Sequence, residues 1–539
     1  MTDYEARKTY IARRDESMRL VDQVFDSPFK VADLKVPDEI PLDAKPLFLS
    51  LVSDDDRKIL QIPPMELLEK LKSGTLKAVP VAGVFCRAAV VAQKLVNCCT
   101  EFLPDLALMY AKKADEYMEK NGKPMGPFHG FPLSIKELYA LEGRAAHWEN
   151  PDLINNMQTD NAVLVNGLLE LGCVPFCRTT APQFLMSIES FSPMHGLTTN
   201  PHNTSLSSGG SSAGEGAMIA IGASHLGLGS DIGGSIRVPA ACCGIYGYRP
   251  TNGRVPITGA DSLTPGYNAI AGVVGPMASS ADLITLFMES IESLELWKRD
   301  TFAERSAWVP VNPKEVTVGY LLDDGHVKPH PPVERAIKEF ISKMEKAQLP
   351  FTVKFKPFTP MQHEEAWKII TGLYFPDGGQ FLKDALTNSG EKATDQTKMI
   401  ALENPNCVEH SVKSLYAAQD VRNKYKTAYQ KHWKDQGVDV VIMPTVPSAA
   451  VVPNTTKYWG YTCVWNLLDY PATIMPIGKV QESDKKDESY TPRNDLDKAH
   501  QDLYSPETYA NAPVGLQIVT PRWNDELALK MMEVFSHAM

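Results

Sequence analysis

The sequence predicts one large α/β domain in which helices cover a mixed central β-sheet. Short apolar strands alternate with amphipathic helices along most of the 539 residues. Alternation of this kind favours layered α/β folds over all-helical or all-strand folds. Hydrophobic residues make up 43% of the chain, which is enough for a sizeable core, and no internal repeat divides it. We therefore expect a single α/β/α architecture.

Residues 1–60 are expected to form a helical arm that packs on a main domain at residues 61–539. A charged helix with Tyr10, Val21 and Phe25 on roughly one side leads into a segment punctuated by prolines. The sequence begins without an apolar leader, and no run of 18 apolar residues predicts a membrane span.

Helices and strands can be placed in order along the rest of the chain. Apolar residues at helical spacing predict helices at 65–74, 75–99, 105–120, 162–171, 213–221, 282–294, 332–347 and 411–436. Gly74 and Gly122 mark two helix ends, because glycine readily adopts the left-handed conformation there. Short apolar runs predict strands at 130–136, 173–177, 316–321 and 438–443. The polar stretch 484–497 is expected to be an exposed loop.

Charge and cysteine content exclude several classes of protein. The net charge is −11 and no basic tract is present, which argues against nucleic acid or an anionic membrane as the main partner. The nine cysteines are scattered without a Cys-x-x-Cys pair, so we expect no metal site, no disulfide framework and no cofactor. The composition fits a cytoplasmic protein that acts on a small molecule, and a homodimer is left open.

One segment, residues 206–250, concentrates the groups that could carry chemistry. It is rich in serine and in paired glycines, and it has a single histidine, His225, far from any candidate nucleophile. Glycine pairs let the backbone approach a reacting atom closely, and adjacent N–H groups can form an oxyanion hole. The open question is which group would activate a serine there.

Two familiar motifs fit this segment poorly. Gly210-Ser-Ser-Ala-Gly214 matches the nucleophile elbow of α/β-hydrolases, but the residues before it are polar and turn-forming instead of an apolar strand. Gly227-Leu-Gly-Ser-Asp-Ile-Gly233 matches a dinucleotide-binding loop, but no convincing helix and no suitably placed acidic residue follow.

A third interpretation places a serine nucleophile and a lysine base in one amide-hydrolysing site. Ser235 follows two glycines, so the N–H groups of four consecutive residues could converge on a developing oxyanion. Those residues are Ile232, Gly233, Gly234 and Ser235. Lys136 ends an apolar strand, where burial would lower its pKa toward the range of a general base.

The helix expected at 213–221 would begin at a second group of serines. Ser212 and Glu215 have the spacing of a capping box. That pattern would fix Ser211 and Ser212 at the amino end of the helix, where the dipole favours negative charge. Each part also has a simpler interpretation, since a lysine after an apolar strand is usually a surface residue and Gly-Gly-Ser is usually a turn.

Longer motifs make the third interpretation specific. Gly209-Gly-Ser-Ser-Ala-Gly-Glu-Gly216 and Asp231-Ile-Gly-Gly-Ser-Ile-Arg-Val-Pro-Ala-Ala241 closely resemble the amidase signature family, and Gly130-Phe-Pro-Leu-Ser-Ile-Lys136 resembles its lysine motif. The spacing between Ser211 and Ser235 also agrees with that family. The likeness covers most of the chain, is nearest to the fungal acetamidase branch, and is weak in residues 1–60.

The resemblance implies roles for the matching residues. Ser235 would be the nucleophile, Ser211 a bridging serine preceded by a cis peptide bond, and Lys136 the base. Ser212 would support the site by holding the bridging serine through a hydrogen bond, and Asp231 and Arg237 would support it as a structural pair. The substrate-binding residues implied are Leu185, Met186 and Trp459. The loop 445–451, with Tyr458 and Trp465, is a candidate wall for the acyl group. Such an apolar pocket would favour small to medium apolar amides.

Three other functions are compared with this one. A fatty acid amide hydrolase shares the catalytic core, although the sequence predicts no amino-terminal membrane span. A non-catalytic binding or receptor protein on the same fold would be expected to lack one of Lys136, Ser211 and Ser235, and all three are present. A glutamine-amide transferase subunit would need partner proteins, and the likeness to acetamidases argues against it.

Overall fold

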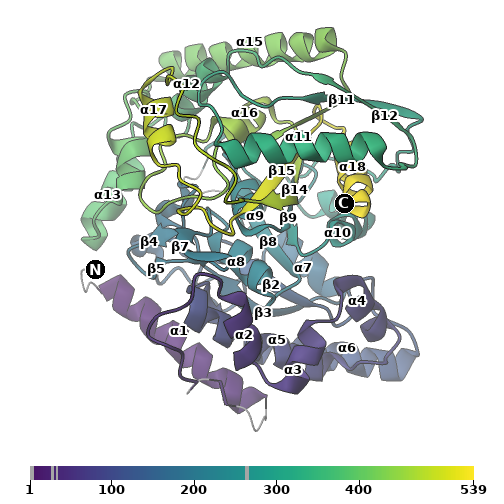
Figure 1. Ribbon diagram of the computed structural model, residues 1–539. Helices are drawn as coiled ribbons and strands as arrows, with labels where there is room; N and C mark the ends of the chain where they lie inside the picture. The colour runs from purple at the N-terminus through teal and green to yellow at the C-terminus, as the bar shows by residue number, and fades with distance from the viewer. Residues whose placement is uncertain (1–4, 26–29, 32–33, 261–265) are drawn as a thin grey trace.

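A mixed β-sheet runs through the computed structural model, which describes residues 5–25, 30–31, 34–260 and 266–539 (Figure 1). In this part of the chain the sheet has 11 strands, in the order β1-β3-β2-β8-β10-β9-β14-β15-β13-β11-β12. They are β1 (Cys99–Phe102), β2 (Pro132–Lys136), β3 (Val174–Thr179), β8 (Leu226–Asp231), β9 (Tyr246–Arg249), β10 (Val273–Ala278), β11 (Glu315–Tyr320), β12 (Thr352–Pro357), β13 (Val440–Pro444), β14 (Ala472–Lys479) and β15 (Pro513–Val519). Two small hairpins, β4–β5 (Phe191–Ser192, Gly196–Leu197) and β6–β7 (Thr199–Asn200, Asn203–Ser207), lie outside it. The predicted α/β class with a mixed sheet is confirmed.

Helices surround the sheet (Figure 1). In the amino-terminal half they are α1 (Glu5–Val24), α2 (Lys45–Leu51), α3 (Asp54–Leu60), α4 (Pro64–Lys72), α5 (Ala78–Val96), α6 (Pro104–Asn121), α7 (Val163–Glu170), α8 (Ala213–Ile221), α9 (Arg237–Cys243) and α10 (Ala281–Ser293). In the carboxy-terminal half they are α11 (Pro331–Lys346), α12 (His363–Leu373), α13 (Gln380–Ser389), α14 (Asp395–Thr397), α15 (Val412–Gln436), α16 (Gly460–Leu468), α17 (Asp495–Asp502) and α18 (Asp525–Ala538).

Most of the predicted elements are present, with ends shifted by a few residues. Gly74 and Gly122 have positive φ angles of 72° and 63°, as expected at helix ends. The helix predicted at 75–99 is α5, and it is buried nearly all round instead of along one stripe. Burial on all sides is what a helix between a sheet and outer helices experiences.

The sheet topology decides which residues meet at the centre of the protein. Strands β2 and β8 are parallel neighbours, with Ser134 opposite Gly227 and Ile135 opposite Leu228. Parallel strands end at the same edge of a sheet, so Lys136 at the end of β2 lies beside the end of β8. Helix α8 packs against both strands, which brings its amino end to the same place.

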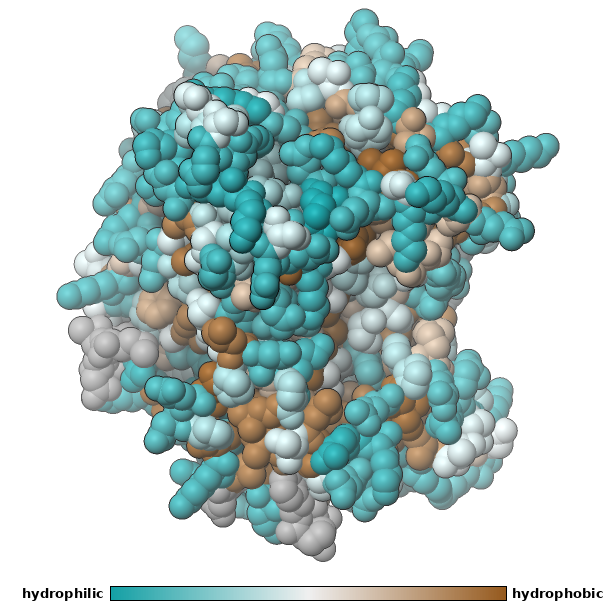
Figure 2. Space-filling model, viewed as in Figure 1, coloured by the Kyte–Doolittle hydropathy of each residue, from teal (hydrophilic) through white to brown (hydrophobic). Residues whose placement is uncertain are grey.

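The described part of residues 1–60 packs closely on the rest of the protein. The Tyr10 hydroxyl of α1 donates to the Cys99 carbonyl at 3.4 Å, and the Phe102 N–H donates to Ser17 Oγ at 3.1 Å. Phe48 and Leu60 belong to the main hydrophobic core. In Figure 2, hydrophobic side chains gather over α2, while most of that face is hydrophilic.

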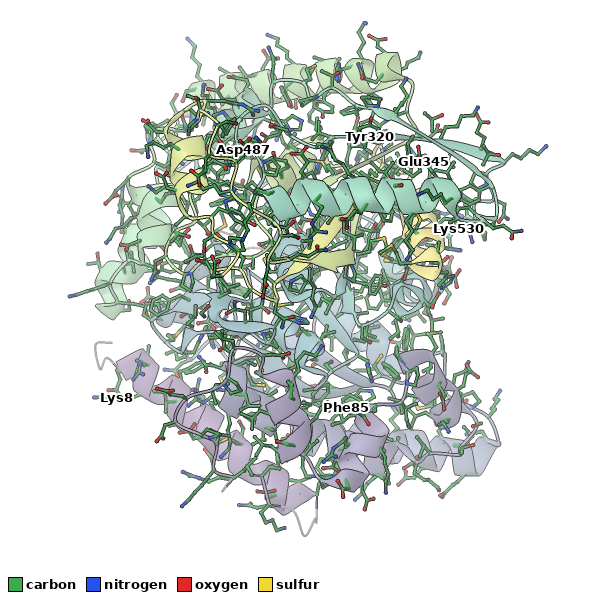
Figure 3. All side chains as sticks on the ribbon, viewed as in Figure 1. Lys8, Phe85, Tyr320, Glu345, Asp487 and Lys530 are labelled. Atoms are coloured by element: carbon green, nitrogen blue, oxygen red, sulfur yellow. The ribbon has the colours of Figure 1, made fainter. Side chains whose placement is uncertain are left out.

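One described helix, α5, is long and apolar enough to cross a membrane by length and composition. The sequence predicted no such segment. Of its 18-residue apolar window, 78% is buried inside the protein. Phe85 of this helix lies deep among packed side chains in Figure 3, whereas the exposed Lys8 and Glu345 lie at the periphery.

The polar stretch 484–497 is only partly an exposed loop. Asp487 is exposed, but Asp484 and Asp497 are buried at 5% and 0% exposure. Arg335 of α11 pairs with Asp484 at 2.6 Å, and the Lys328 N–H donates to Asp497 at 3.0 Å. The prediction was wrong for these two residues because partners distant in sequence satisfy both carboxylates.

Candidate active site

Lys136 lies at the centre of a cluster of serine hydroxyls. It ends β2, a fully buried strand, and its side chain is 0% exposed. The Lys136 Nζ donates to Ser211 Oγ at 2.7 Å and to Ser230 Oγ at 2.9 Å. The structure therefore brings together a lysine and two serines that are 75 and 94 residues away in sequence.

Burial lowers the pKa of Lys136 below that of an ordinary lysine. Removal from water lowers the pKa of Lys136 to about 7, and the nearby carboxyl groups of Asp231, Glu215 and Glu137 oppose this shift. Desolvation disfavours the charged ammonium, so an amine with this pKa is neutral in a large fraction of molecules at neutral pH. A neutral amine can accept a proton from a hydroxyl that touches it.

Ser211 is presented by a tight turn at the amino end of α8. The Gly210–Ser211 peptide bond is cis, as the resemblance implies. A methyl group on Gly210 would lie 1.9 Å from the Glu189 carbonyl oxygen, so only glycine fits in this turn.

Ser212 differs from the role expected for it. Its hydroxyl accepts a hydrogen bond from the Ser230 N–H at 3.2 Å, and its own N–H donates to the Ser235 carbonyl at 3.0 Å. Among the described residues it therefore joins the backbones of two segments and makes no hydrogen bond to Ser211. This corrects the expectation that Ser212 holds the bridging serine directly.

The predicted capping box is also wrong, although α8 has the predicted bounds. The Ser212 side chain makes no capping hydrogen bond. The Glu215 carboxyl accepts hydrogen bonds from Ser134 Oγ at 2.5 Å and Thr179 Oγ1 at 2.8 Å instead. Burial raises the pKa of Glu215 to about 8, against the effect of these two bonds and of Lys136. Glu215 links α8 to β2 and β3.

The loop from Asp231 to Ser235, called the oxyanion loop below, is shaped by one buried ion pair. Asp231 and Arg237 are both 0% exposed in their side chains and lie 2.9 Å apart. The expected structural pair is present. Burial alone would raise the pKa of Asp231, but the Arg237 guanidinium and the Asn466 amide lower it to about 2. Asp231 is therefore a carboxylate at neutral pH.

Of the four N–H groups from Ile232 to Ser235, one donates a hydrogen bond to a described residue and three do not. The Gly234 N–H donates to Asp231 Oδ1 at 2.8 Å, so it is already engaged. The N–H groups of Ile232, Gly233 and Ser235 have no hydrogen-bond acceptor among the described residues. Of the four donors predicted for an oxyanion, three are thus available and one fixes the loop.

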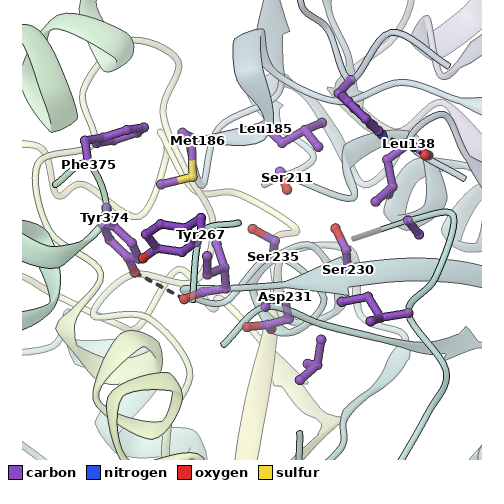
Figure 4. Close-up of a pocket in the computed structure, with 16 residues that line it drawn as sticks. Leu138, Leu185, Met186, Ser211, Ser230, Asp231, Ser235, Tyr267, Tyr374 and Phe375 are labelled. Carbon is purple, nitrogen blue, oxygen red and sulfur yellow. Dashed lines mark hydrogen bonds between the residues drawn. The ribbon is translucent and has the colours of Figure 1, made fainter. Parts of the chain in front are cut away.

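Ser235 faces an apolar cavity (Figure 4). The Ser235 side chain lies with Ser211 and Ser230 at one wall. The cavity has a volume of about 100 Å³. The other lining residues are mainly apolar or aromatic: Leu138, Trp148, Leu185, Met186, Asp231, Ile232, Ile257, Ala260, Tyr267, Gly272, Val273, Tyr374 and Phe375.

Two of the three predicted substrate-binding residues line this cavity. Leu185 and Met186 do so, whereas Trp459 is not among the described residues that line it. The Trp459 indole instead lies beside the oxyanion loop, with Nε1 3.1 Å from the position of a methyl group on Gly233. The predicted acyl wall is also wrong: residues 446–458 line a separate hollow, and Trp465 is fully buried.

Sequence reasoning missed several residues of the site. The sequence assigns no chemical step to Ser230, yet its hydroxyl accepts a hydrogen bond from Lys136. Its place one residue before Asp231 at the end of an apolar strand was the available signal. Tyr267, Tyr374 and Phe375 line the cavity from segments whose sequence carries no comparable motif.

The chain is similar to known proteins along most of its length. A sequence model of a protein family, described as Amidase, matches residues 81–529. The acetamidase of Aspergillus oryzae is 35% identical over 523 residues, which cover 92% of this chain and 95% of the relative. The acetamidase of Emericella nidulans is 34% identical over 535 residues and 96% of each chain, so the likeness extends into the segment 1–60. The solved structure of a fatty acid amide hydrolase aligns with a TM-score of 0.90 at 31% identity, over 99% of this chain and 96% of that one.

Proposed function

Because the chain belongs to the amidase signature family and is an amide hydrolase, we propose that Ser235, Ser211 and Lys136 carry out its reaction. The observation that supports this assignment best is the contact of 2.7 Å between Lys136 Nζ and Ser211 Oγ in a buried site. A histidine base is not needed, because a desolvated lysine can take the serine proton.

In this proposal the proton moves through Ser211. Neutral Lys136 takes the proton of Ser211, and Ser211 takes that of Ser235 while the Ser235 oxygen attacks the amide carbon. The same relay returns a proton to the leaving nitrogen as the C–N bond breaks, which releases ammonia or an amine. Water then hydrolyses the acyl ester on Ser235 to the carboxylic acid.

The oxyanion of the tetrahedral intermediate would be held by backbone N–H groups. Those of Ile232, Gly233 and Ser235 are the proposed donors, since Gly234 already donates to Asp231. Each such donor contributes about 3 kcal/mol to stabilisation of the transition state. Asp231 and Arg237 would fix the loop without touching the substrate.

The substrates proposed are small to medium amides with an apolar acyl group. The one charged residue that lines the cavity among those described, Asp231, is paired with Arg237, which leaves no charge to bind an ionic substrate. Leu185 and Met186 would contact the acyl group. The likeness to acetamidases favours short acyl chains, while a fatty acid amide hydrolase activity is the alternative that the structural likeness supports.

Hydrolysis of acetamide, benzamide and oleamide by the purified protein would separate these substrates. We expect kcat/KM for acetamide or benzamide to exceed that for oleamide, and Ser235→Ala to abolish all three activities. Preference for oleamide would favour the fatty acid amide hydrolase alternative. Absence of hydrolysis of a wider amide panel would favour a binding protein on this fold.

Three further assignments remain proposals. We place the protein in the cytoplasm as a monomer or homodimer without nucleic-acid partners, which fits its acidic charge. We propose that residues 1–60 form a helical arm and that residues 61–539 form the catalytic domain. The family match at 81–529 lies within that domain.

A further inference from the structure

Two side-chain hydroxyls donate hydrogen bonds to carbonyl groups of the oxyanion loop. Thr462 of α16 donates its hydroxyl to the Gly233 carbonyl at 2.6 Å. Tyr374, which directly follows α12, donates its hydroxyl to the Ile232 carbonyl at 3.3 Å (Figure 4). Helices α12 and α16 pack against each other, so one helix pair delivers both hydroxyls.

The direction of each carbonyl fixes the direction of the next N–H. In a trans peptide unit the C=O and N–H bonds point to opposite sides. The unit between Gly233 and Gly234 follows this rule, since its carbonyl accepts from Thr462 and its N–H donates to Asp231 at 2.8 Å. By the same rule, because the Ile232 carbonyl points toward the Tyr374 hydroxyl, the Gly233 N–H points away from that hydroxyl. That N–H has no acceptor among the described residues.

We propose that the Tyr374 hydroxyl is a positioning group that orients the Gly233 N–H toward the oxyanion of the reaction. This inference rests on the proposed function of Ser235. Tyr374 acts through the peptide unit between Ile232 and Gly233, and its hydroxyl donates no proton to the substrate. A hydrogen bond of 3.3 Å is long, and such contacts commonly shorten in the transition-state complex.

The Trp459 indole lies close to the same part of the loop, with Nε1 3.1 Å from the position of a methyl group on Gly233. An indole N–H can only donate, so a hydrogen bond from Trp459 to the Tyr374 oxygen would leave the tyrosine proton for the Ile232 carbonyl. Glycine at position 233 permits this approach, because a methyl group there would lie 2.5 Å from the Tyr374 oxygen. Tyr374 and Trp459 therefore both lie against Gly233 of the oxyanion loop.

Removal of the hydroxyl alone tests the proposal, since the Tyr374 ring also lines the cavity. Tyr374→Phe keeps the ring and loses the hydrogen bond. We expect kcat to fall about 10- to 100-fold with KM unchanged, because only stabilisation of the oxyanion is weakened. A trifluoromethyl ketone carrying the acyl group of the substrate adds to the serine as an oxyanion, and its Ki should rise by the same factor. Trp459→Phe should show the same pattern with a smaller loss.

A matched control removes another buried tyrosine hydroxyl away from the site. Tyr504 donates to the Asp484 carbonyl at 2.7 Å, and Tyr504→Phe should leave kcat, KM and the ketone Ki unchanged. Wild-type kcat and Ki in a folded Tyr374→Phe variant would overturn the positioning role, as would a change in KM alone. Failure of the proposed function is distinct, because the wild-type protein itself would then hydrolyse no amide.

Discussion

The Lys136 amine lies 2.7 Å from the Ser211 hydroxyl and 2.9 Å from the Ser230 hydroxyl, and the lysine side chain is fully buried. Lys136 and Ser211 are 0% and 1% exposed. No carboxylate forms an ion pair with this lysine among the described residues, so the surroundings favour its neutral form. A neutral lysine between two hydroxyls is the basis of the catalytic proposal.

The activity should depend on the protonation of Lys136. Because burial lowers the pKa of Lys136 to about 7, the amine is protonated and inactive as a base below that pH. We expect kcat/KM to rise about tenfold per pH unit at acidic pH and to level off above about 7. Lys136→Ala should lower kcat/KM by several orders of magnitude. Near wild-type activity of this variant at pH 7 would rule out the lysine base.

Ser230 should tune the base without forming a bond to the substrate. Its hydroxyl accepts from Lys136 at 2.9 Å and so favours the charged amine. In Ser230→Ala we expect kcat/KM to fall about tenfold, with the acidic limb of the pH profile moved to lower pH. Ser230→Thr should restore kcat/KM and the position of the acidic limb.

Ser224→Ala serves as the matched control for this variant. The Ser224 hydroxyl bonds to Ser134 at 3.0 Å and to the Leu226 carbonyl at 3.1 Å, away from Lys136. Its pH profile should match that of the wild type. An unchanged profile in Ser230→Ala as well would show that Ser230 is only part of the scaffold.

The pair of Asp231 and Arg237 should contribute strongly to stability. Asp231→Asn leaves a buried guanidinium without its charge partner, and we expect the free energy of unfolding at pH 7 to fall by about 3–5 kcal/mol. Chemical denaturation would measure this loss. Asp55→Asn, at an exposed ion pair, is the control and should leave the free energy of unfolding nearly unchanged. Equal effects of the two substitutions would contradict a structural role for the buried pair.

The same pair predicts how stability changes with pH. The pKa of Asp231 is lowered from 3.8 in the unfolded chain to about 2 in the folded protein. A lowered pKa stabilises the folded state above the unfolded value, and this stabilisation is lost as the pH falls from about 4 to about 2. The shift corresponds to about 2 kcal/mol. Asp231→Asn should lack this part of the acid dependence.

Met186 should limit the size of the acyl group. It lines the cavity next to Leu185, so Met186→Ala opens space where the acyl chain is proposed to lie. We expect the ratio of kcat/KM for octanamide to that for acetamide to rise at least about tenfold, since one or two methylene contacts contribute that much to discrimination. Met109→Ala, at a surface position on α6 that is 50% exposed, should leave the ratio unchanged. A constant ratio in Met186→Ala would place the acyl group elsewhere.

Local patterns in the sequence predicted the ends of α8, the strand ending at Lys136 and the ion pair of Asp231 with Arg237. These features depend on nearby residues or on motifs with a fixed spacing. The capping box failed because Glu215 finds Ser134 and Thr179 on neighbouring strands, and tertiary partners can replace a local hydrogen bond.

Contacts set by topology could not be derived from the sequence. Ser230 meets Lys136 only because β8 pairs with β2, and the chain contains no local signal of that pairing. Tyr374 reaches the oxyanion loop through the packing of α12 on α16, which depends on helices in a distant part of the sequence. Trp459 is predicted to line the pocket but lies beside Gly233 of the oxyanion loop for the same reason.

The most direct test of the catalytic proposal is to map the serine that a fluorophosphonate probe modifies. Mass spectrometry of the labelled wild-type protein should show the modification on Ser235, with competition by substrate amides. Labelling should be absent in Ser235→Ala and strongly slowed in Lys136→Ala. Modification of Ser212 instead would contradict the proposal and favour the nucleophile elbow at residues 210–214.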